Sequence, residues 1–464
     1  MTRLLSTLLR CAVALPLTFA GAAALANPSV YPTGTTIYDP AKAWNGYVIF
    51  SGTDEKTHLI DMDGNEVHRW DYQGFPGELL DPAVTAGARG HVLVQLESSD
   101  KTGTGTVPGA KIFSNKSIAE LDWSGKVVWK WSGEGTPAGE ARQHHDWQRL
   151  SNGNTLVLAN WLHKVPGFTL PQQLDDAVYE VTPDGKVVWK WAVSEHLDEL
   201  GFTAEQLKLI RDASTPDYFH LNDMTSVGPN KWFDAGDQRF DPDNILVDSR
   251  NANFVAIIDK KSGRIVWHLG PNLPPLVGHE AGVNAPPAPA AGQPVNQFVG
   301  QHDAHIIPKG LPGAGDLLLF DNQGEAGYPA AELATVGGSR VLEIDPTTGK
   351  VVWSYTADNS DEPLWAFRSA FISSARRLPN GNTLIDEGMN GRFFQVTPSG
   401  EIVWEYVSPY FAKTAAAGAG HPVTSNWVYR AQPVPYDWVP GNTSRSEKAV
   451  VPPALATFRI QPGN

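Results

Sequence analysis

One hydrophobic pattern recurs along the chain: two apolar strands, a tight turn containing glycine, and a third strand that ends in tryptophan. Residues 152–191 (NGNTLVLAN…AVYEVTPDGKVVWKW) and 380–406 (NGNTLIDEG…RFFQVTPSGEIVWEY) show it most clearly. A weaker first copy spans 61–70. The other five copies, these two included, end at equivalent tryptophans: Trp129, Trp189, Trp267, Trp353 and Trp404. Repeats of short strands with Gly-containing turns are typical of radial β architectures. We therefore predict an all-β fold, a six-bladed β-propeller, in which these tryptophans pack between blades.

The spacing of the copies predicts loop and short helical insertions, since roughly 70 residues per blade exceed a compact propeller repeat. Residues 194–218 contain a capping box, Thr203 with Gln206, and are expected to include a helix. Residues 271–297 are rich in Pro, Ala and Gly and are expected to form a long surface loop. We expect one propeller domain over 27–438. A tail over 439–464 is expected to be irregular, except that 451–461 has the composition of a strand that pairs with an edge.

The first 26 residues have the features of a cleavable export signal. Arg3 and Arg10 precede an apolar stretch that ends in Ala-Leu-Ala at 24–26. No later run approaches the roughly 20 apolar residues that cross a bilayer, so the mature chain is expected to be periplasmic or secreted. The only cysteine, Cys11, leaves with the signal, which excludes a disulfide, a thiol nucleophile and a thiolate metal site.

The chain is acidic, which bears on its partners. Its net charge is -14, and loss of Arg3 and Arg10 with the signal changes it to -16. Such a charge argues against binding to nucleic acid or to anionic membranes. An anionic substrate therefore requires a locally positive site.

Histidines occupy equivalent places in the predicted innermost strands. Counted back from the following turn, His145, His302 and Ser373 fall at one position, in HDWQRLSNGN, HDAHIIPKG and SSARRLPNGN. His220 is at a similar point in HLNDMTSVGPN. Because equivalent positions of radial repeats converge on one axis, we expect these residues to surround one mouth of the central channel.

Two further polar residues are predicted at this mouth. The end of one antiparallel strand lies beside the start of its neighbour, which places Arg250 next to His220. Asn222 follows His220 by two residues and so shares its face of the strand. By the same alternation, His144 and His145 point to opposite faces, and so do His302 and His305. That parity argues against a zinc site in the HDAH motif, and we expect no metal.

Such a site offers imidazoles, a guanidinium and an amide. Arg presents a planar fork to an oxyanion, and a neutral imidazole can act as a nucleophile. A second imidazole can protonate a leaving oxygen or accept a proton. This set suits the transfer of a small anionic group between oxygens, and sulfuryl transfer in particular, because a sulfate monoester carries a single negative charge.

At these residues the chain resembles the bacterial arylsulfate sulfotransferases. The segments that carry the resemblance include HHDWQRLSNGN, FHLND, DSRNANFVAIID, QHDAHIIPKG, LLLFDNQGEAG and RLPNGNTL, which with the repeats span most of residues 35–430. The resemblance implies transfer of sulfate from an aryl sulfate to a phenol without a nucleotide donor or other cofactor. It also implies a ping-pong route through a sulfohistidine.

The resemblance assigns roles residue by residue. His302 matches the nucleophile, and His220, Asn222 and Arg250 match groups that hold the sulfuryl oxygens. His145 matches a further catalytic histidine, with His144 as the open alternative, and Ser373 stands where the family has a small hydroxyl residue that binds substrate. Members of the family carry an N-terminal β domain that contributes to dimerisation. In the mature chain only about 20 residues precede the first strand, which leaves the oligomeric state open.

Two other functions remain as alternatives. A quinone-dependent dehydrogenase is also an exported, Trp-rich propeller, but it requires a calcium site and often a vicinal cysteine pair, and the mature chain has no cysteine. A non-catalytic propeller would serve as a binding scaffold. Within the first class, a sulfatase would use water as the acceptor, and acceleration of turnover by phenol distinguishes it from a transferase.

Overall fold

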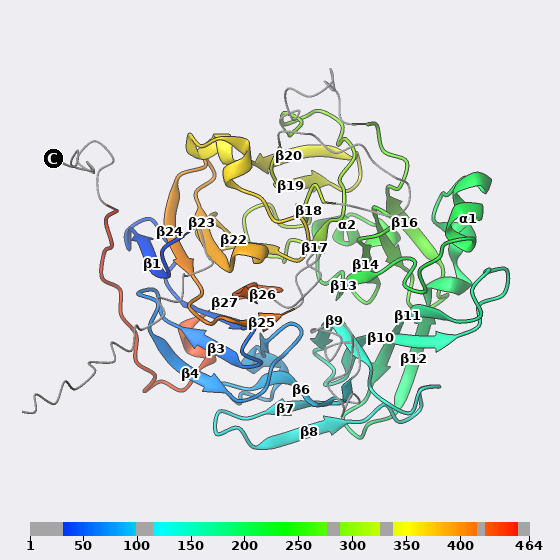
Figure 1. Cartoon of the computed structure of the whole chain (residues 1–464), viewed down its shortest axis with the longest axis horizontal. Coiled ribbons are helices and arrows are strands. Elements are labelled where there is room, and N and C mark those ends of the chain that lie inside the picture. The colour runs from blue at the N-terminus through cyan, green and yellow to red at the C-terminus, as the bar shows by residue number, and fades with distance from the viewer. Residues whose placement is uncertain (1–30, 99–114, 276–287, 325–336, 415–422, 453–464) are drawn as a thin grey trace, which may run out of the picture.

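The strands form a closed ring of sheets, as predicted. The computed structural model describes residues 31–98, 115–275, 288–324, 337–414 and 423–452. Within these ranges, six sheets of four or five strands surround a central axis (Figure 1). The prediction of an all-β, six-bladed propeller is therefore confirmed.

Each blade is an antiparallel meander that runs from an innermost strand at the channel to an outermost strand at the rim. In that order, blade 1 contains β27 (Ala431–Val434), β2 (Tyr47–Ser51), β3 (Thr57–Ile60) and β4 (Glu66–Trp70). Blade 2 contains β5 (Glu78–Leu79), β6 (Val92–Ser98), β7 (Asn115–Leu121) and β8 (Val127–Trp131). Blade 3 contains β9 (Gln143–Arg149), β10 (Thr155–His163), β11 (Gln173–Val181) and β12 (Val187–Ala192).

The other three blades repeat this order. Blade 4 contains β13 (Leu221–Ser226), β14 (Ile245–Ser249), β15 (Phe254–Ile258) and β16 (Ile265–Leu269). Blade 5 contains β17 (His302–Ile306), β18 (Leu317–Asp321), β19 (Arg340–Asp345) and β20 (Lys350–Tyr355). Blade 6 contains β21 (Ser374–Arg377), β22 (Thr383–Glu387), β23 (Arg392–Val396), β24 (Ile402–Val407) and β1 (Gly34–Tyr38).

Both ends of the described chain help to close the ring. The innermost strand of blade 1 is β27, which comes from the C-terminal part of the sequence and pairs with β2. At the other end, β1 pairs with β24 as the outermost strand of blade 6. Closure removes the exposed sheet edges that an open array of blades would leave.

A recurring contact at the outer strands links each blade to the next. In five blades, the indole N–H of the outer-strand tryptophan donates to a carbonyl in the last turn of the following blade. The pairs are Trp70 with Asp122, Trp189 with Lys260, Trp267 with Pro346, Trp353 with Pro398 and Trp404 with Met62. The repeated tryptophans thus pack between blades, as the sequence predicted.

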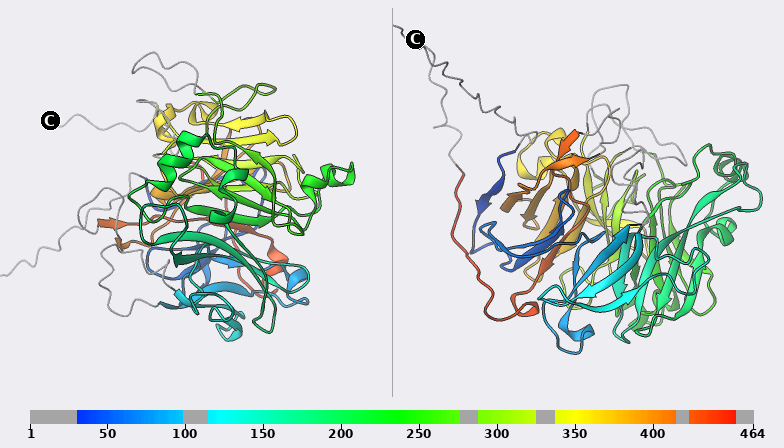
Figure 2. Two further views of the ribbon diagram at one scale, coloured as in Figure 1. Left: turned by 90° about the vertical axis from the view of Figure 1, so that its right-hand side faces the viewer. Right: turned by 60° about the horizontal axis from the view of Figure 1, so that its bottom comes forward.

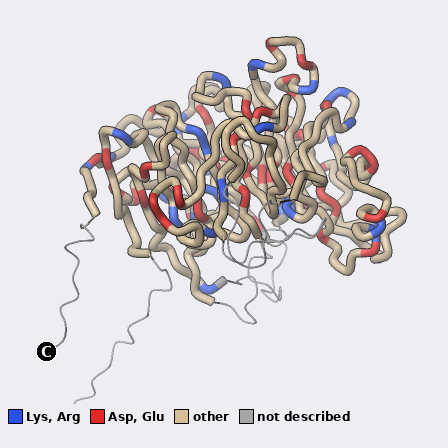
Figure 3. Tube along the Cα trace, turned by 90° about the horizontal axis from the view of Figure 1, so that it is seen from above, with Lys and Arg blue, Asp and Glu red and all other residues tan. Residues whose placement is uncertain are grey.

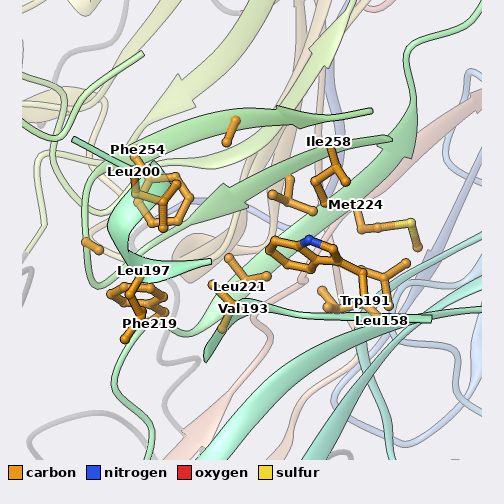
Figure 4. Packing of buried hydrophobic residues seen from close by; sticks show 14 of the residues in the cluster. Leu158, Trp191, Val193, Leu197, Leu200, Phe219, Leu221, Met224, Phe254 and Ile258 are labelled. Atoms are coloured by element: carbon orange, nitrogen blue, oxygen red, sulfur yellow. The ribbon is translucent and has the colours of Figure 1, made fainter. Parts of the chain in front are cut away.

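Apolar faces of neighbouring blades form the core. Between blades 3 and 4, Leu158 and Trp191 pack against Leu221, Met224 and Ile258, and all five are buried (Figure 4). Burial of such a side chain stabilises the fold by about 1.5–3 kcal/mol relative to its exposure. This packing fixes where β9 and β13, the innermost strands of the two blades, enter the channel.

The insertions lie outside the sheets. Helix α1 (Ala204–Arg211) begins at the predicted capping box, in which Thr203 accepts from the N–H of Gln206, and it lies at the rim of the ring (Figure 1). A second short helix, α2 (Lys231–Asp234), follows β13. A small extra sheet pairs β25 (Ala412–Thr414) with β26 (Val423–Ser425). The predicted 271–297 loop contains no helix or strand in its described parts.

The terminal segments are only partly described. From 439 to 452 the tail is irregular apart from one bridge between Val450 and Tyr38. In Figure 2 the tail, coloured red, runs along the side of the molecule. The predicted strand at 451–461 and the predicted signal at 1–26 fall almost entirely outside the described residues. Figure 3 shows acidic and basic residues interspersed over the described trace. No helix in the described part of the chain is long and apolar enough to cross a membrane.

Candidate active site

The predicted residues meet at one mouth of the channel. The innermost strands of blades 3, 4 and 5 begin at or beside His145, His220 and His302. The imidazole ring centres of His145 and His220 are 4.5 Å apart. The backbone N–H of Arg250 donates to the carbonyl of His220 at 3.2 Å, as expected for neighbouring strand ends. Residues far apart in the chain therefore form one cluster.

A bulge in β9 changes the predicted position of His144. Alternation predicts opposite faces for His144 and His145, and this prediction is wrong. His145 has a φ of 57°, and the pairing with β10 shifts register beside it. The two rings consequently converge, with their Nδ1 atoms 2.7 Å apart in a shared hydrogen bond. Both histidines are buried, so the site contains a pair of imidazoles at this point.

A fixed tautomer is imposed on His302. Its Nδ1 lies 2.8 Å from Oδ1 of Asn322 and 3.0 Å from the carbonyl of Gly300. Both partners are acceptors, so Nδ1 carries the hydrogen. The opposite nitrogen, Nε2, accepts the backbone N–H of Ile372 at 3.2 Å. The lone pair of the neutral ring is therefore on Nε2.

Burial and neighbouring charge favour the neutral form of three site histidines: His302, His145 and His144. Burial, followed by the guanidinium of Arg250, lowers the pKa of His302 well below its ordinary value. Burial, followed by His220 and His144, does the same for the pKa of His145. For His144, burial and then His220 lower the pKa to about 3. A neutral imidazole is the nucleophilic form.

An aspartate orients His220. Oδ2 of Asp217 lies 2.5 Å from Nδ1 of His220, so Nδ1 donates to the carboxylate. Burial opposes ionisation of Asp217, but the charge and hydrogen bond of His220 outweigh it and lower the pKa of Asp217. The ionised carboxylate therefore holds Nδ1 of His220 toward Asp217 and fixes the orientation of the ring.

The amide and hydroxyl predicted at the site are both hydrogen-bonded to the protein. Asn222 is buried, and its Nδ2 donates to the carbonyl of Gln301 at 2.8 Å. The Ser373 hydroxyl accepts the N–H of Gly388 at 3.0 Å and donates to Oγ of Ser369 at 2.8 Å. Ser373 lies in the same turn as Ile372, beside His302, but its hydroxyl holds this turn in place.

Aromatic residues form the wall next to the histidines. Tyr429 is buried, and its ring centre is 5.4 Å from that of His145 and 6.2 Å from that of His302. Phe75 packs on Tyr429 at 4.3 Å and on His145 at 4.9 Å. The site thus places polar nitrogens against an apolar aromatic surface.

A buried ion cluster around Arg430 lies next to these aromatic residues, with the guanidinium 5.5 Å from the ring centre of Tyr429. Arg430 is within 3.0 Å of Asp146, 2.7 Å of Asp223 and 3.1 Å of Asp303. These aspartates belong to the innermost strands of blades 3, 4 and 5, and two of them directly follow His145 and His302. The cluster therefore ties the histidine-bearing strands to the strand that closes the ring.

His305 lies away from the nucleophile candidate. A bulge at Asp303, whose φ is 59°, interrupts alternation in β17. His305 nevertheless does not converge with His302, because it lines a cavity of about 480 Å³ at the opposite mouth, where the innermost strands end. In the described part of the chain, no group of three or more His, Cys, Asp or Glu side chains is arranged to hold a metal ion.

Sequence reasoning missed several residues of the site. Asn322 directly follows β18, within the FDN segment that carries the resemblance. That segment could have indicated a residue of the site. Asp217, three residues before His220, had only that spacing to suggest its role. Tyr429 and Phe75 lie outside the recognised strand segments, and no sequence signal indicated them.

The fold and the site define a class: a propeller with a cluster of buried imidazoles beside a guanidinium at one channel mouth. The family comparison agrees with this class. The arylsulfotransferase (ASST) family model matches residues 112–409, which is more than half of the chain. The chain belongs to this family, and membership supports a sulfotransferase role. A comparison with curated proteins finds no match.

Several solved propeller structures show a more distant similarity. A protein of unknown function from Bacteroides caccae has 13% identity and a TM-score of 0.45 over 84% of this chain and 99% of that one. Streptogramin B lyase has 14% identity and a TM-score of 0.34 over 74% of this chain and 80% of that one. Quinohemoprotein alcohol dehydrogenase from Comamonas testosteroni has 12% identity and a TM-score of 0.36 over 86% and 75%. At these values the similarities carry no conclusion about this chain.

Proposed function

We propose that the protein is an exported sulfotransferase that moves a sulfuryl group from an aryl sulfate to a phenol through a sulfohistidine at His302. The observation that carries the proposal is the fixed tautomer of His302. Asn322 and Gly300 hold the hydrogen on Nδ1, which leaves the lone pair on Nε2. The family membership supports sulfuryl as the transferred group.

In the first half-reaction, Nε2 of His302 attacks sulfur and the bond between sulfur and the aryl oxygen breaks. Arg250 and His220 donate hydrogen bonds to the sulfuryl oxygens, and Asp217 holds the ring of His220 in place. Asn222 belongs to the predicted substrate-binding set. Ser373, the other predicted member, acts by holding the turn that places Ile372 beside His302. The bonded nitrogen of His302 becomes cationic, and its Nδ1–H remains hydrogen-bonded to Asn322.

In the second half-reaction, a phenol replaces the departed one. The acceptor oxygen attacks sulfur, and the electron pair of the N–S bond returns to Nε2 of His302. His145 donates a proton to the departing phenolate in the first half-reaction and accepts one from the phenol in the second. Its ring lies beside that of His220, in the same cluster. Phe75 and Tyr429 supply an apolar surface for the aromatic ring of either substrate.

Transient kinetics test the proposal. Without a phenol, 4-nitrophenyl sulfate is expected to release one equivalent of 4-nitrophenol per protein in a burst, and added phenol is expected to restore turnover. His302→Asn removes the nucleophile and should abolish the burst. The matched control is His305→Asn, on the same strand but at the other mouth, which should retain it. A full burst in His302→Asn would overturn the assignment.

A further inference from the structure

Three titratable side chains form a line that leads away from the proposed reaction centre. His145 shares a hydrogen bond with His144, Nδ1 to Nδ1, at 2.7 Å. Nε2 of His144 lies 3.4 Å from Oδ1 of Asp176. The other oxygen of Asp176 accepts the backbone N–H of Leu221 at 2.8 Å, which fixes the carboxyl group beside His144. Each of the three titratable residues is no more than 4% exposed.

We infer that Asp176, His144 and His145 are a proton relay, in which Asp176 stores the proton that the two half-reactions exchange. The inference rests on the proposed function and deepens it. His145 touches the substrate oxygen, whereas His144 and Asp176 are positioning residues that act through it.

In the donor half-reaction, the relay gives up one proton. Nε2–H of His145 protonates the departing phenolate oxygen as Nε2 of His302 bonds to sulfur. The hydrogen on Nδ1 of His144 moves to Nδ1 of His145, and the carboxyl hydrogen of Asp176 moves to Nε2 of His144. Both relay imidazoles remain neutral, and Asp176 is left as a carboxylate.

In the acceptor half-reaction, each step reverses. The phenol hydrogen passes to Nε2 of His145 as the phenol oxygen bonds to sulfur and the N–S bond breaks. Hydrogens then shift from His145 to His144 and from His144 to Asp176. Over both half-reactions, one aryl sulfate and one phenol are consumed, and one new aryl sulfate and one new phenol are formed. No other reactant is required.

The electrostatics of the three groups favour storage on the carboxyl. Burial, followed by the charge of Asp217, raises the pKa of Asp176 well above its ordinary value, which favours the protonated carboxyl. Burial lowers the pKa of His144 to about 3, and that of His145 lies well below its ordinary value. A buried imidazolium is therefore disfavoured, and a concerted shift avoids forming one. Proton transfer across the 3.4 Å between His144 and Asp176 requires this distance to shorten when substrate binds, as contacts between catalytic groups often do.

Dependence on the leaving group provides the test. Departure of unsubstituted phenol requires protonation more than departure of 4-nitrophenol, which is the stronger acid. Asp176→Asn keeps an acceptor for the Leu221 N–H but cannot release a proton. With phenyl sulfate, the rate of sulfohistidine formation is expected to fall by about 10²-fold, the usual contribution of general acid catalysis. With 4-nitrophenyl sulfate, the rate should change by less than about 5-fold.

Two further variants separate a relay from a structural role. His144→Phe should reproduce the selective loss with phenyl sulfate, and Asp176→Asn combined with His144→Phe should cost no more than either alone. The control is His163→Gln in the same blade, whose Nε2 pairs with Asp175 at 2.9 Å away from the site. It should leave the rates with both donors unchanged.

The outcomes are distinguishable. An equal slowing with both aryl sulfates, or additive losses in the double variant, would overturn the relay. A parent protein that forms no sulfohistidine would instead overturn the proposed function. The 4-nitrophenyl sulfate burst of each variant also reports that it has folded.

Discussion

The backbone N–H of Ile372 donates to Nε2 of His302 at 3.2 Å. This contact occupies the lone pair that the proposed reaction uses. Ile372 has a φ of 56°, and the left-handed region is strained for a β-branched residue, at a cost of about 1–3 kcal/mol. Asn322 holds the turn by donating to the carbonyls of Ser369 and Ile372 at 2.7 Å each. In the proposed reaction, bonding of Nε2 to sulfur would release this N–H to donate to a sulfuryl oxygen.

Asn322→Leu should slow the reaction and destabilise the fold together. The variant removes the acceptor for Nδ1–H of His302 and both donors that hold the Ile372 turn. Each buried polar group left unpaired costs about 1–3 kcal/mol. We expect a burst rate lower by about 10²-fold and a free energy of unfolding lower by several kcal/mol, measured by stopped-flow absorbance and urea titration. A burst at the parent rate would show that Asn322 does not position the nucleophile.

The burst rate should persist in mild acid. Protonation of His302 would remove its lone pair, but burial and Arg250 lower its pKa well below the ordinary 6.5. As pH falls from 7, the neutral fraction is therefore lost only below that ordinary value. The rate of 4-nitrophenol release should change by less than about 2-fold between pH 7 and pH 5.5. A midpoint near 6.5 would contradict the neutral, buried nucleophile.

Arg430→Gln should destabilise the propeller strongly. It leaves Asp146, Asp223 and Asp303 without the guanidinium that they share. Loss of one partner from a buried ion cluster costs about 3–5 kcal/mol. Burial, followed by the charge of Asp146, raises the pKa of Asp223 well above its ordinary value. The loss should therefore be smaller at low pH, where protonation of Asp223 relieves part of the repulsion in the cluster. Urea unfolding at two pH values measures this effect.

A surface pair provides the control for that variant. Arg239 binds Asp237 at 2.6 Å in an exposed loop, where an ion pair contributes about 0–1 kcal/mol. Arg239→Gln should therefore leave unfolding nearly unchanged. Equal losses in the two arginine variants would argue against a structural role for the central cluster.

Processing of the N-terminus tests the predicted export. Expressed with its own first 26 residues in a Gram-negative host, the protein should appear in the periplasm or medium with Asn27 as its first residue. Edman sequencing and intact mass identify that end directly. Retention of Met1 in the cytoplasm would contradict the export signal.

The repeated strands were predictable because their signals are local. The turns at 152–154 and 184–185 fix the ends of β10, β11 and β12 to within a few residues. The strand that closes blade 1 was not assigned, since 431–434 lies far from its partners and carries no part of the repeated pattern. Its position depends on closure of the whole ring, which no local pattern encodes.

The site was predictable where it follows the repeat and not where the backbone departs from it. Equivalent positions placed His145, His220 and His302 together, with Arg250 beside them. Alternation failed at His144 because a bulge with positive φ at His145 adds a residue to the strand. Such a bulge is stabilised by tertiary contacts and leaves no mark in the sequence.

Mass spectrometry of the sulfuryl adduct tests the central claim most directly. The protein is exposed briefly to 4-nitrophenyl sulfate without an acceptor, quenched at alkaline pH, digested and mapped. We predict one sulfuryl group per chain on the peptide that contains His302, and its loss on addition of phenol. An adduct on another residue, or none while 4-nitrophenol is released, would contradict a sulfohistidine at His302.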